Sequence, residues 1–70
     1  MSKLLSSREV VTALVREGFV FVFQKGSHAK YRKVSGSETF TVIVPDGKRE
    51  IPIGTLRSIM RQSHLGREKL

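Results

Sequence analysis

The tripeptide Gly26-Ser27-His28 lies between two runs with strand-like alternation, residues 19–25 and 28–34. A glycine and a serine between two such runs are typical of a hairpin turn, so His28 is expected at the start of the second strand. Histidine exchanges a proton near neutral pH, because its unperturbed pKa is about 6.5. The tripeptide therefore suggests acid-base chemistry at a hairpin end. A polar turn residue without a chemical role is the alternative interpretation.

The chain is strongly basic. Its 70 residues include 13 Lys and Arg against 6 Asp and Glu, which gives a formal charge of +7. A field of this sign favours a polyanionic partner, with nucleic acid ahead of an anionic membrane surface. The absence of cysteine excludes disulfides and thiolate metal sites, and we expect no bound metal. Since no apolar run is long enough for a signal peptide or a membrane span, we expect a cytoplasmic protein.

Cations surround the predicted position of His28. Period-two alternation places Lys30 and Arg32 on the face of His28, and Lys25 lies directly before the turn. If the polyanionic partner is RNA, whose 2′-hydroxyl can act as the nucleophile, His28 is a candidate general base or general acid. Lys25 and Lys30 would stabilise the charge on the phosphoryl oxygens, while Arg32 would hold a flanking phosphate. The candidates for the group opposite His28 are Ser27, Tyr31, Lys25 and a bound water.

The chain begins with a predicted helix over residues 7–17. Ser6 and Glu9 have the spacing of a capping box, and Gly18 is a left-handed stop. The apolar residues at helical spacing are Val10, Val11, Leu14 and Val15.

The first strand, residues 19–25, alternates strictly. Phe19, Phe21 and Phe23 are expected on one face, as core beneath the helices, although a base-stacking role is the sharper hypothesis. Val20 and Val22 are expected on the other face. If Ile43 joins them there, this apolar face would suit a protein partner.

The second half of the chain predicts a strand over residues 40–44, closed by Pro45, and a helix over 53–63. The helix residues expected to be buried are Ile53, Leu56, Ile59 and Met60. Leu65 is expected to fold back onto the core, and residues 66–70 to form a frayed tail.

These elements predict one domain over residues 1–70, of class α+β and order α-β-β-β-α. Both helices should lie on one face of a three-stranded antiparallel sheet. This is the architecture of the double-stranded-RNA-binding domain.

Three segments carry a resemblance to a known family: Gly18-Phe19, Lys25-Gly26-Ser27-His28 and residues 54–62. Val44-Pro45 and Glu50-Ile51 add support at family-like spacing. Over roughly residues 6–65 the chain resembles the HicA-type toxins (the YcfA-like family), the mRNA interferases of bacterial HicA–HicB toxin-antitoxin pairs.

The resemblance implies a small ribonuclease that cleaves mRNA without a metal or other cofactor. It implies that His28 is catalytic, with Gly26 and Ser27 shaping its turn. The RNA-binding residues expected are Lys25, Gly26, Ser27, Lys30 and Arg32. A HicB-type antitoxin would cover His28, and contact with DNA would be made only through that antitoxin.

The chain departs from the family pattern at three places. Phe23 stands where many relatives have Arg, Ala29 where a second His is common, and Ser63-His64 replaces the usual Ala-Gly. A non-catalytic double-stranded-RNA-binding module is the alternative function. Such modules usually carry a lysine cluster at the start of the second helix, where this chain has residues Ile53-Gly54-Thr55-Leu56.

Overall fold

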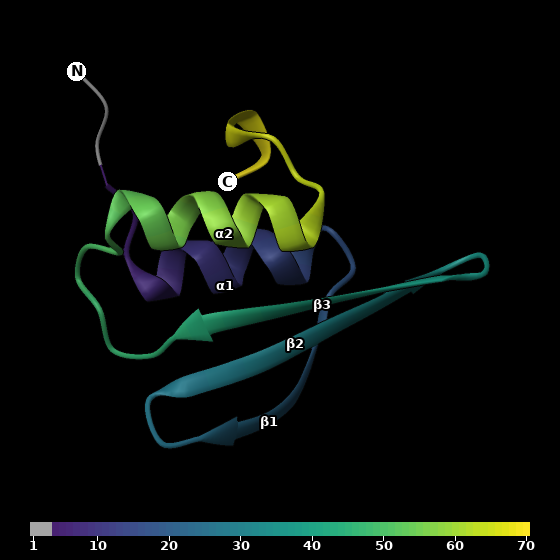
Figure 1. Ribbon diagram of the computed structural model, residues 1–70, viewed down its shortest axis with the longest axis horizontal. Coiled ribbons are helices and arrows are strands. Elements are labelled where there is room, and N and C mark those ends of the chain that lie inside the picture. Colours follow the sequence, from purple (N-terminus) through teal and green to yellow (C-terminus); the bar gives the residue numbers. More distant parts are fainter. Residues whose placement is uncertain (1–3) are drawn as a thin grey trace.

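Two helices lie on one side of a three-stranded antiparallel sheet in the computed structural model, which describes residues 4–70 (Figure 1). The elements are α1 Ser7–Arg16, β1 Val20–Lys25, β2 His28–Ser35, β3 Glu38–Pro45, α2 Ile53–Ser63 and a short 3-10 helix, η1 Arg67–Lys69. The strand order is β1-β2-β3. The predicted α-β-β-β-α architecture of the double-stranded-RNA-binding domain is therefore confirmed.

Helix α1 has the predicted capping box. The Ser6 hydroxyl accepts a hydrogen bond from the Glu9 amide at 3.0 Å, and the Glu9 carboxylate accepts one from the Ser6 amide at 2.9 Å. Gly18 follows the helix with a φ of 99°, a backbone conformation that favours glycine. These local interactions set both ends of the helix.

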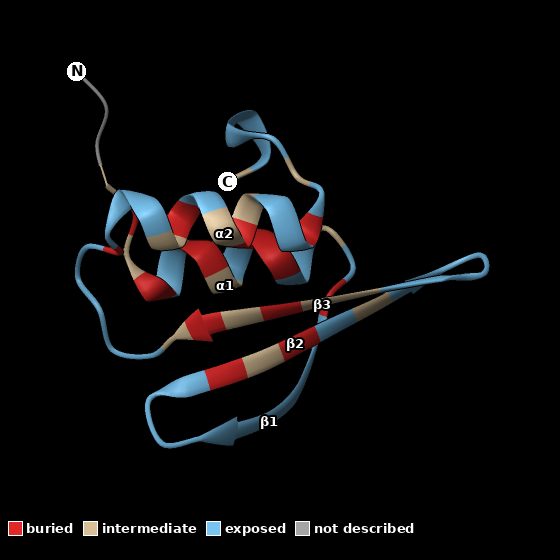
Figure 2. Ribbon diagram, viewed as in Figure 1, coloured by how far each residue is buried: buried red, intermediate tan, exposed pale blue. Residues whose placement is uncertain are grey.

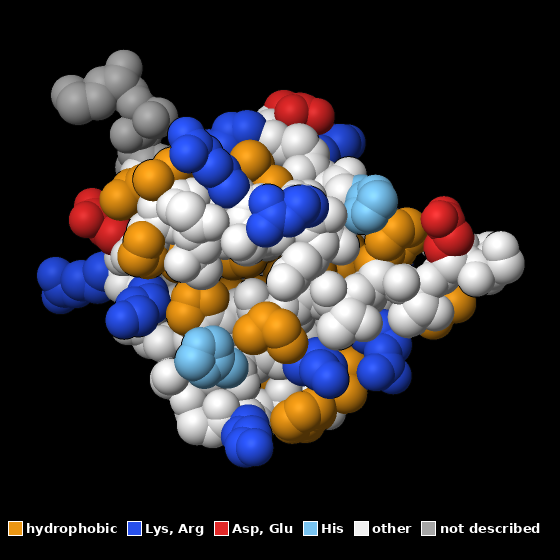
Figure 3. Space-filling model, in the orientation of Figure 1, with side chains coloured by type: hydrophobic (Ala, Val, Ile, Leu, Met, Phe, Trp, Pro, Cys, Tyr) orange, Lys and Arg blue, Asp and Glu red, His pale blue; other side chains and the backbone are white. Residues whose placement is uncertain are grey.

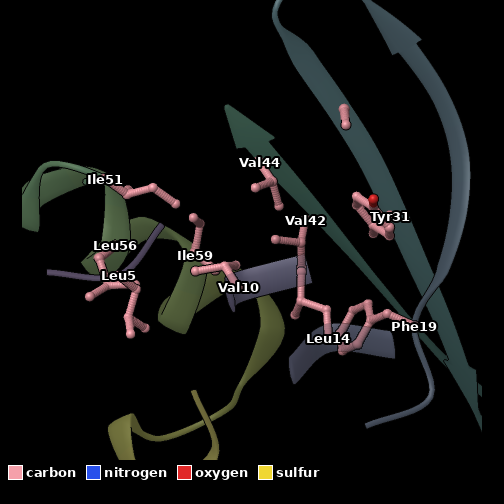
Figure 4. Close-up of a cluster of buried hydrophobic side chains, with 11 residues drawn as sticks. Leu5, Val10, Leu14, Phe19, Tyr31, Val42, Val44, Ile51, Leu56 and Ile59 are labelled. Atoms are coloured by element: carbon pink, nitrogen blue, oxygen red, sulfur yellow. The ribbon is translucent and has the colours of Figure 1, made fainter. Parts of the chain in front are cut away.

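The core lies between the helices and the strands nearest to them, β2 and β3 (Figures 2 and 4). Its largest fully buried side chains are Phe19, Leu14, Ile51, Leu56, Ile59, Val10, Val42 and Val44. Helix α2 also covers the free edge of β3, because the side chain of Gln62 accepts a hydrogen bond from the Ile43 amide at 3.0 Å. Strand β1 lies at the far edge of the sheet, away from both helices (Figure 1).

The expectation that three phenylalanines lie beneath the helices is wrong for two of them. Phe19 is buried, but Phe21 and Phe23 are 55% and 46% exposed. Every residue of β1 is exposed, because the helices do not reach this strand. A β-bulge between Phe21 and Phe23 also changes the register: Phe21 pairs with Tyr31, whereas Phe23 pairs with Lys30. Since Tyr31 and Lys30 lie on opposite faces of β2, Phe23 lies on the opposite face from Phe21.

Two further burial expectations differ from the structure. Ile53, expected in the core, is 46% exposed because it occupies the first turn of α2, and the preceding Ile51 is fully buried in its place. Met60 is only partly buried. Leu56 and Ile59 are fully buried, as predicted.

The C-terminal segment is ordered against the domain. Leu65 packs against the core, as expected, and Leu70 does so too. The Arg16 guanidinium donates a hydrogen bond to the carbonyl of Lys69 at 3.2 Å, so the expectation of a frayed tail is wrong. His64 ends α2 in the left-handed conformation, with a φ of 61°. Within residues 4–70 no helix is long and apolar enough to cross a membrane.

Candidate active site

The β1–β2 turn presents His28 at the end of the sheet. Gly26 has a φ of 59°, which a glycine adopts without steric cost, and His28 is the first residue of β2. Because β2 is the central strand, His28 has a register partner on each side: Lys25 on β1 and Pro45 on β3. The imidazole is exposed and stands between two neighbouring strands.

The strand alternation of β2 confirms which side chains accompany His28. Ala29 and Tyr31 are buried on the helix side, at 6% and 8% exposure. His28, Lys30 and Arg32 therefore lie on the opposite side, which we call the outer face of the sheet. One imidazole and two cations share this face. Lys25 is the register partner of His28 on the neighbouring strand β1.

Phe23 belongs to the same outer face, which the alternation of the sequence did not indicate. The ammonium group of Lys30 lies 5.0 Å from the centroid of the Phe23 ring, a cation–π geometry. The bulge brings the ring there, since it shifts Phe23 by one position relative to β2. An exposed aromatic ring beside a cation is suited to stacking on a nucleic-acid base.

Hydrogen bonds from the loop after β3 and from Gln24 of β1 stabilise the turn that precedes His28. The Asp46 amide donates to the carbonyl of Ser27 at 2.7 Å. The side-chain amide of Gln24 donates to the carbonyl of Gly26 and to the Asp46 carboxylate, both at 3.1 Å. These bonds hold the turn from β1 on one side and from the loop on the other.

The cations near His28 are available to a ligand. Among the described residues, Lys25, Lys30 and Arg32 make no ion pair with a carboxylate. Figure 3 shows Lys and Arg side chains spread over a face that also carries both histidines. Unpaired cations that share a face produce a positive potential that attracts polyanions.

The geometry of the sheet excludes Tyr31 as the group that would carry the second proton transfer together with His28. Its ring lies on the helix side, and burial, with a smaller contribution from the negative charge of Asp46, raises the pKa of its hydroxyl. Ser27 and Lys25 are exposed and adjacent to His28. No cluster of three potential metal-binding side chains occurs within residues 4–70.

The structure also places Ala29 and His64, at which the sequence comparison noted differences from the resembled pattern. Ala29 lies in the core, with Gln24 and Val44 as its register partners. A larger side chain there would point toward the helix side, away from His28. His64 lies at the opposite end of the domain core, where its ring contacts Phe40 at a centroid distance of 4.8 Å. Neither residue belongs to the group around His28.

The fold and this face define a small protein of the double-stranded-RNA-binding shape in which the exposed His28 lies among cations. A family model described as the HicA toxin of bacterial toxin-antitoxin systems matches residues 7–65. The matched range includes α1, the whole sheet with His28, and α2. The chain therefore belongs to the HicA toxin family and is a toxin of a toxin-antitoxin system. No curated protein matches the chain.

Proposed function

We propose that this toxin is a metal-independent endoribonuclease that cleaves mRNA in the cytoplasm, with His28 as its catalytic residue. The observation that carries the proposal is the position of His28. It is exposed on the outer face together with Lys30 and Arg32, and Lys25 of the neighbouring strand is its register partner. Family membership and the net charge of +7 support the same function.

RNA supplies the nucleophile for this reaction. The 2′-oxygen forms a bond to phosphorus, the bond from phosphorus to the 5′-oxygen breaks, and the products carry a 2′,3′-cyclic phosphate and a 5′-hydroxyl. One proton leaves the 2′-hydroxyl and one is delivered to the departing oxygen. His28 carries one of these transfers, which contributes a factor of about 10² to 10⁴. Ser27, Lys25 or a water molecule carries the other.

The neighbouring cations stabilise the charge that grows on the phosphoryl oxygens. Lys25 is the register partner of His28, and Lys30 lies two residues further along the same face, about 7 Å away. Arg32, two residues beyond, binds the next phosphate with its planar guanidinium. Gly26 and Ser27 hold the turn and leave open space for the RNA backbone, since apart from its chain neighbours no atom lies within 4 Å of where a Cβ of Gly26 would be.

A HicB-type antitoxin would inhibit the enzyme by covering His28. The outer face carries partly or largely exposed apolar residues beside its cations, notably Val20, Phe23 and Ile43. Val20 and Ile43 pair with residues of this face, Arg32 and Lys30, so Ile43 joins Val20 on one face of the sheet. A partner that buries these apolar groups and supplies carboxylates for the cations would exclude RNA from His28.

Cleavage of RNA in the presence of a chelator tests the proposal. The purified chain should produce fragments with cyclic phosphate ends, and His28→Ala should produce none. His64→Gly is the matched control, because His64 is the other exposed histidine and glycine suits its left-handed backbone. This control should cleave like the original chain.

Other outcomes would contradict the proposal in distinct ways. Binding of RNA by both the original chain and His28→Ala, with no cleavage by either, would identify a non-catalytic double-stranded-RNA-binding module. Cleavage that persists in His28→Ala would assign the chemistry to another group. Cleavage that requires an added divalent metal would refute the metal-independent mechanism.

A further inference from the structure

A cavity lies on the helix side of the sheet, opposite the face of His28. It has a volume of about 830 Å³ and opens between the start of α1, the loop after β3 and the hairpin end of β1 and β2. The helices do not reach β1 at the far edge of the sheet, which leaves the helix side of this strand uncovered (Figure 1). The buried residues Ala29 and Tyr31 form its floor.

Three cations line this cavity. Arg8 comes from the first turn of α1, and Lys48 and Arg49 come from the loop after β3. All three are exposed, and none makes an ion pair within the described part of the chain. Since two of them are guanidinium groups, which bind two oxygens at once, the rim is suited to a phosphate.

The hydroxyl of Tyr31 is an independent sign of a ligand. The residue is 8% exposed and lines the cavity, but no described residue hydrogen-bonds its hydroxyl. Every fully buried side-chain nitrogen or oxygen of the described residues has a partner, so the Tyr31 oxygen is the part of the ring that reaches the open space. Figure 4 shows Tyr31 on β2 at the sheet side of the buried cluster. A nearly buried phenol without a partner is a hydrogen-bond donor directed into the cavity.

The remaining polar groups favour a nucleotide over an acidic peptide. The Asp46 carboxylate lines the cavity, and from residues 4–70 it accepts a single hydrogen bond, from Gln24, so it can accept further bonds. A nucleotide offers a base with N–H donors for such a carboxylate and a phosphate for the cations. An acidic peptide would place its carboxylates near that of Asp46, which is repulsive.

The cavity is connected to the site of His28 through shared backbone. Pro45, which lines the cavity, is the register partner of His28. The next residue, Asp46, donates its amide to the carbonyl of Ser27 in the turn. An RNA strand that passes over the hairpin end of the sheet therefore meets His28 on one side and the cavity on the other.

We propose that this cavity binds one nucleotide of the RNA strand, next to the phosphate that is cleaved at His28. Arg8, Lys48 and Arg49 hold its phosphate, Tyr31 donates a hydrogen bond to it, and Asp46 accepts from its base. The position of this nucleotide relative to the cleaved bond rests on the proposed function, whereas binding itself does not.

Nuclear magnetic resonance titrations of the ¹⁵N-labelled 70-residue chain test the proposal without any cleavage. The probes are the four nucleoside 5′-monophosphates, the free nucleosides, inorganic phosphate and a tetraglutamate peptide. We expect at least one nucleoside monophosphate to shift the amide signals of Arg8, Gln24, Tyr31 and residues 46–49. It should bind more tightly than its nucleoside or inorganic phosphate, because neither of these fills both parts of the cavity.

Three variants locate the binding. Tyr31→Phe keeps the ring in the core and should weaken nucleotide binding about fivefold, the usual effect of one hydrogen bond. The double variant Lys48→Ala/Arg49→Ala should weaken it about tenfold or more, because bonds from charged groups to phosphate are stronger. Arg57→Ala removes an exposed cation of α2 outside the cavity and should have no effect.

The outcomes separate this proposal from the proposed function. If tetraglutamate shifts the same signals more strongly than any nucleotide, the cavity is a protein-binding site and the proposal is overturned. It is also overturned if the cavity variants bind nucleotides like the original chain, even when RNA cleavage is normal. If those variants lose nucleotide binding while the original chain cleaves no RNA, the proposed enzyme activity fails and the nucleotide site stands.

Discussion

Lys30 and Phe23 lie on the same face of the sheet, with the lysine ammonium group 5.0 Å from the centroid of the phenylalanine ring. Their register pairing follows from the bulge in β1, which moves Phe23 from the helix side to the face of His28. An aromatic ring therefore lies beside a cation on the face of the proposed catalytic histidine, where it is suited to stacking on a base.

Replacement of Phe23 by Ala tests this role. We expect the KM for RNA to rise about fivefold or more, because stacking of one base on an aromatic ring contributes about 1–3 kcal/mol. The free energy of unfolding should change little, since the ring is 46% exposed. Steady-state cleavage and urea unfolding measure the two effects. Val34→Ala is the control, because Val34 is a 69% exposed residue near the far end of β2. An equal rise in the KM of the Val34→Ala variant would refute the stacking role of Phe23.

Two glycines in equivalent conformations allow the effect of a substitution on folding stability to be distinguished from its effect on RNA cleavage. Gly26 and Gly36 have φ values of 59° and 61°, and both have open space where a Cβ would be added. Replacement of either by Ala should therefore cost about 1 kcal/mol of folding free energy, the price of a left-handed alanine. Only Gly26→Ala should also slow RNA cleavage, by about tenfold, because a small displacement of His28 misaligns the reaction. Similar cleavage by the two variants would show that the turn does not position His28.

Two apolar residues of α2 differ in burial and should differ in their contribution to stability. Leu56 is fully buried, so Leu56→Ala should lower the free energy of unfolding by about 2–5 kcal/mol through lost burial and the cavity left behind. Ile53→Ala should lower it by less than about 1 kcal/mol, because Ile53 is 46% exposed. Urea denaturation of both variants checks this order. An equal loss would mean that the first turn of α2 is packed in solution.

The capping box of α1 predicts a measurable stability effect. Ser6→Ala removes the acceptor for the Glu9 amide and should destabilise the domain by about 1 kcal/mol. Thr12→Ala changes an exposed position in the middle of the same helix and should be neutral or slightly stabilising, since alanine has the higher helix propensity. Thermal unfolding of the two variants gives the comparison. A neutral Ser6→Ala would indicate that water replaces the cap.

The pKa of Tyr31 predicts how stability depends on alkaline pH. Burial and the charge of Asp46 raise this pKa above the ordinary value of 10.0, so the folded state holds the phenolic proton more tightly than the unfolded state. The resulting stabilisation is complete below about pH 9, and it is lost as the pH rises through 10 toward the raised pKa. Tyr31→Phe has no such proton. Urea unfolding between pH 8 and pH 11 should therefore show a steeper loss for the original chain, and parallel curves would contradict the raised pKa.

Most of the secondary structure could be predicted because its signals are local. The capping box at Ser6, the left-handed glycine at position 18 and the turn at Gly26 act within a few residues of the chain. Strand alternation in β2 likewise depends only on the geometry of an extended chain, so the separation of His28 from Tyr31 was correct. These features required no knowledge of what packs against them.

Other features depend on contacts between segments that are distant in the sequence. A bulge changes the register of β1 against β2, and this brings Phe23 beside Lys30 although strict alternation had placed it with Phe19. The helices lie over β2 and β3 and do not cover β1, which leaves Phe21 exposed and opens the cavity above Tyr31. No periodicity within one segment could indicate either result.

The amino-acid sequence alone determined the order of the elements, the exposed face of β2 and the turn that presents His28, because each follows from interactions between near neighbours. Tertiary structure decided the rest: Phe23 lies on the outer face, and Arg8, Lys48 and Arg49 line the same cavity as Tyr31. Strand register and the position of the helices over the sheet set these contacts. Both are properties of the packed domain, because burial and pairing are settled between segments and not within them.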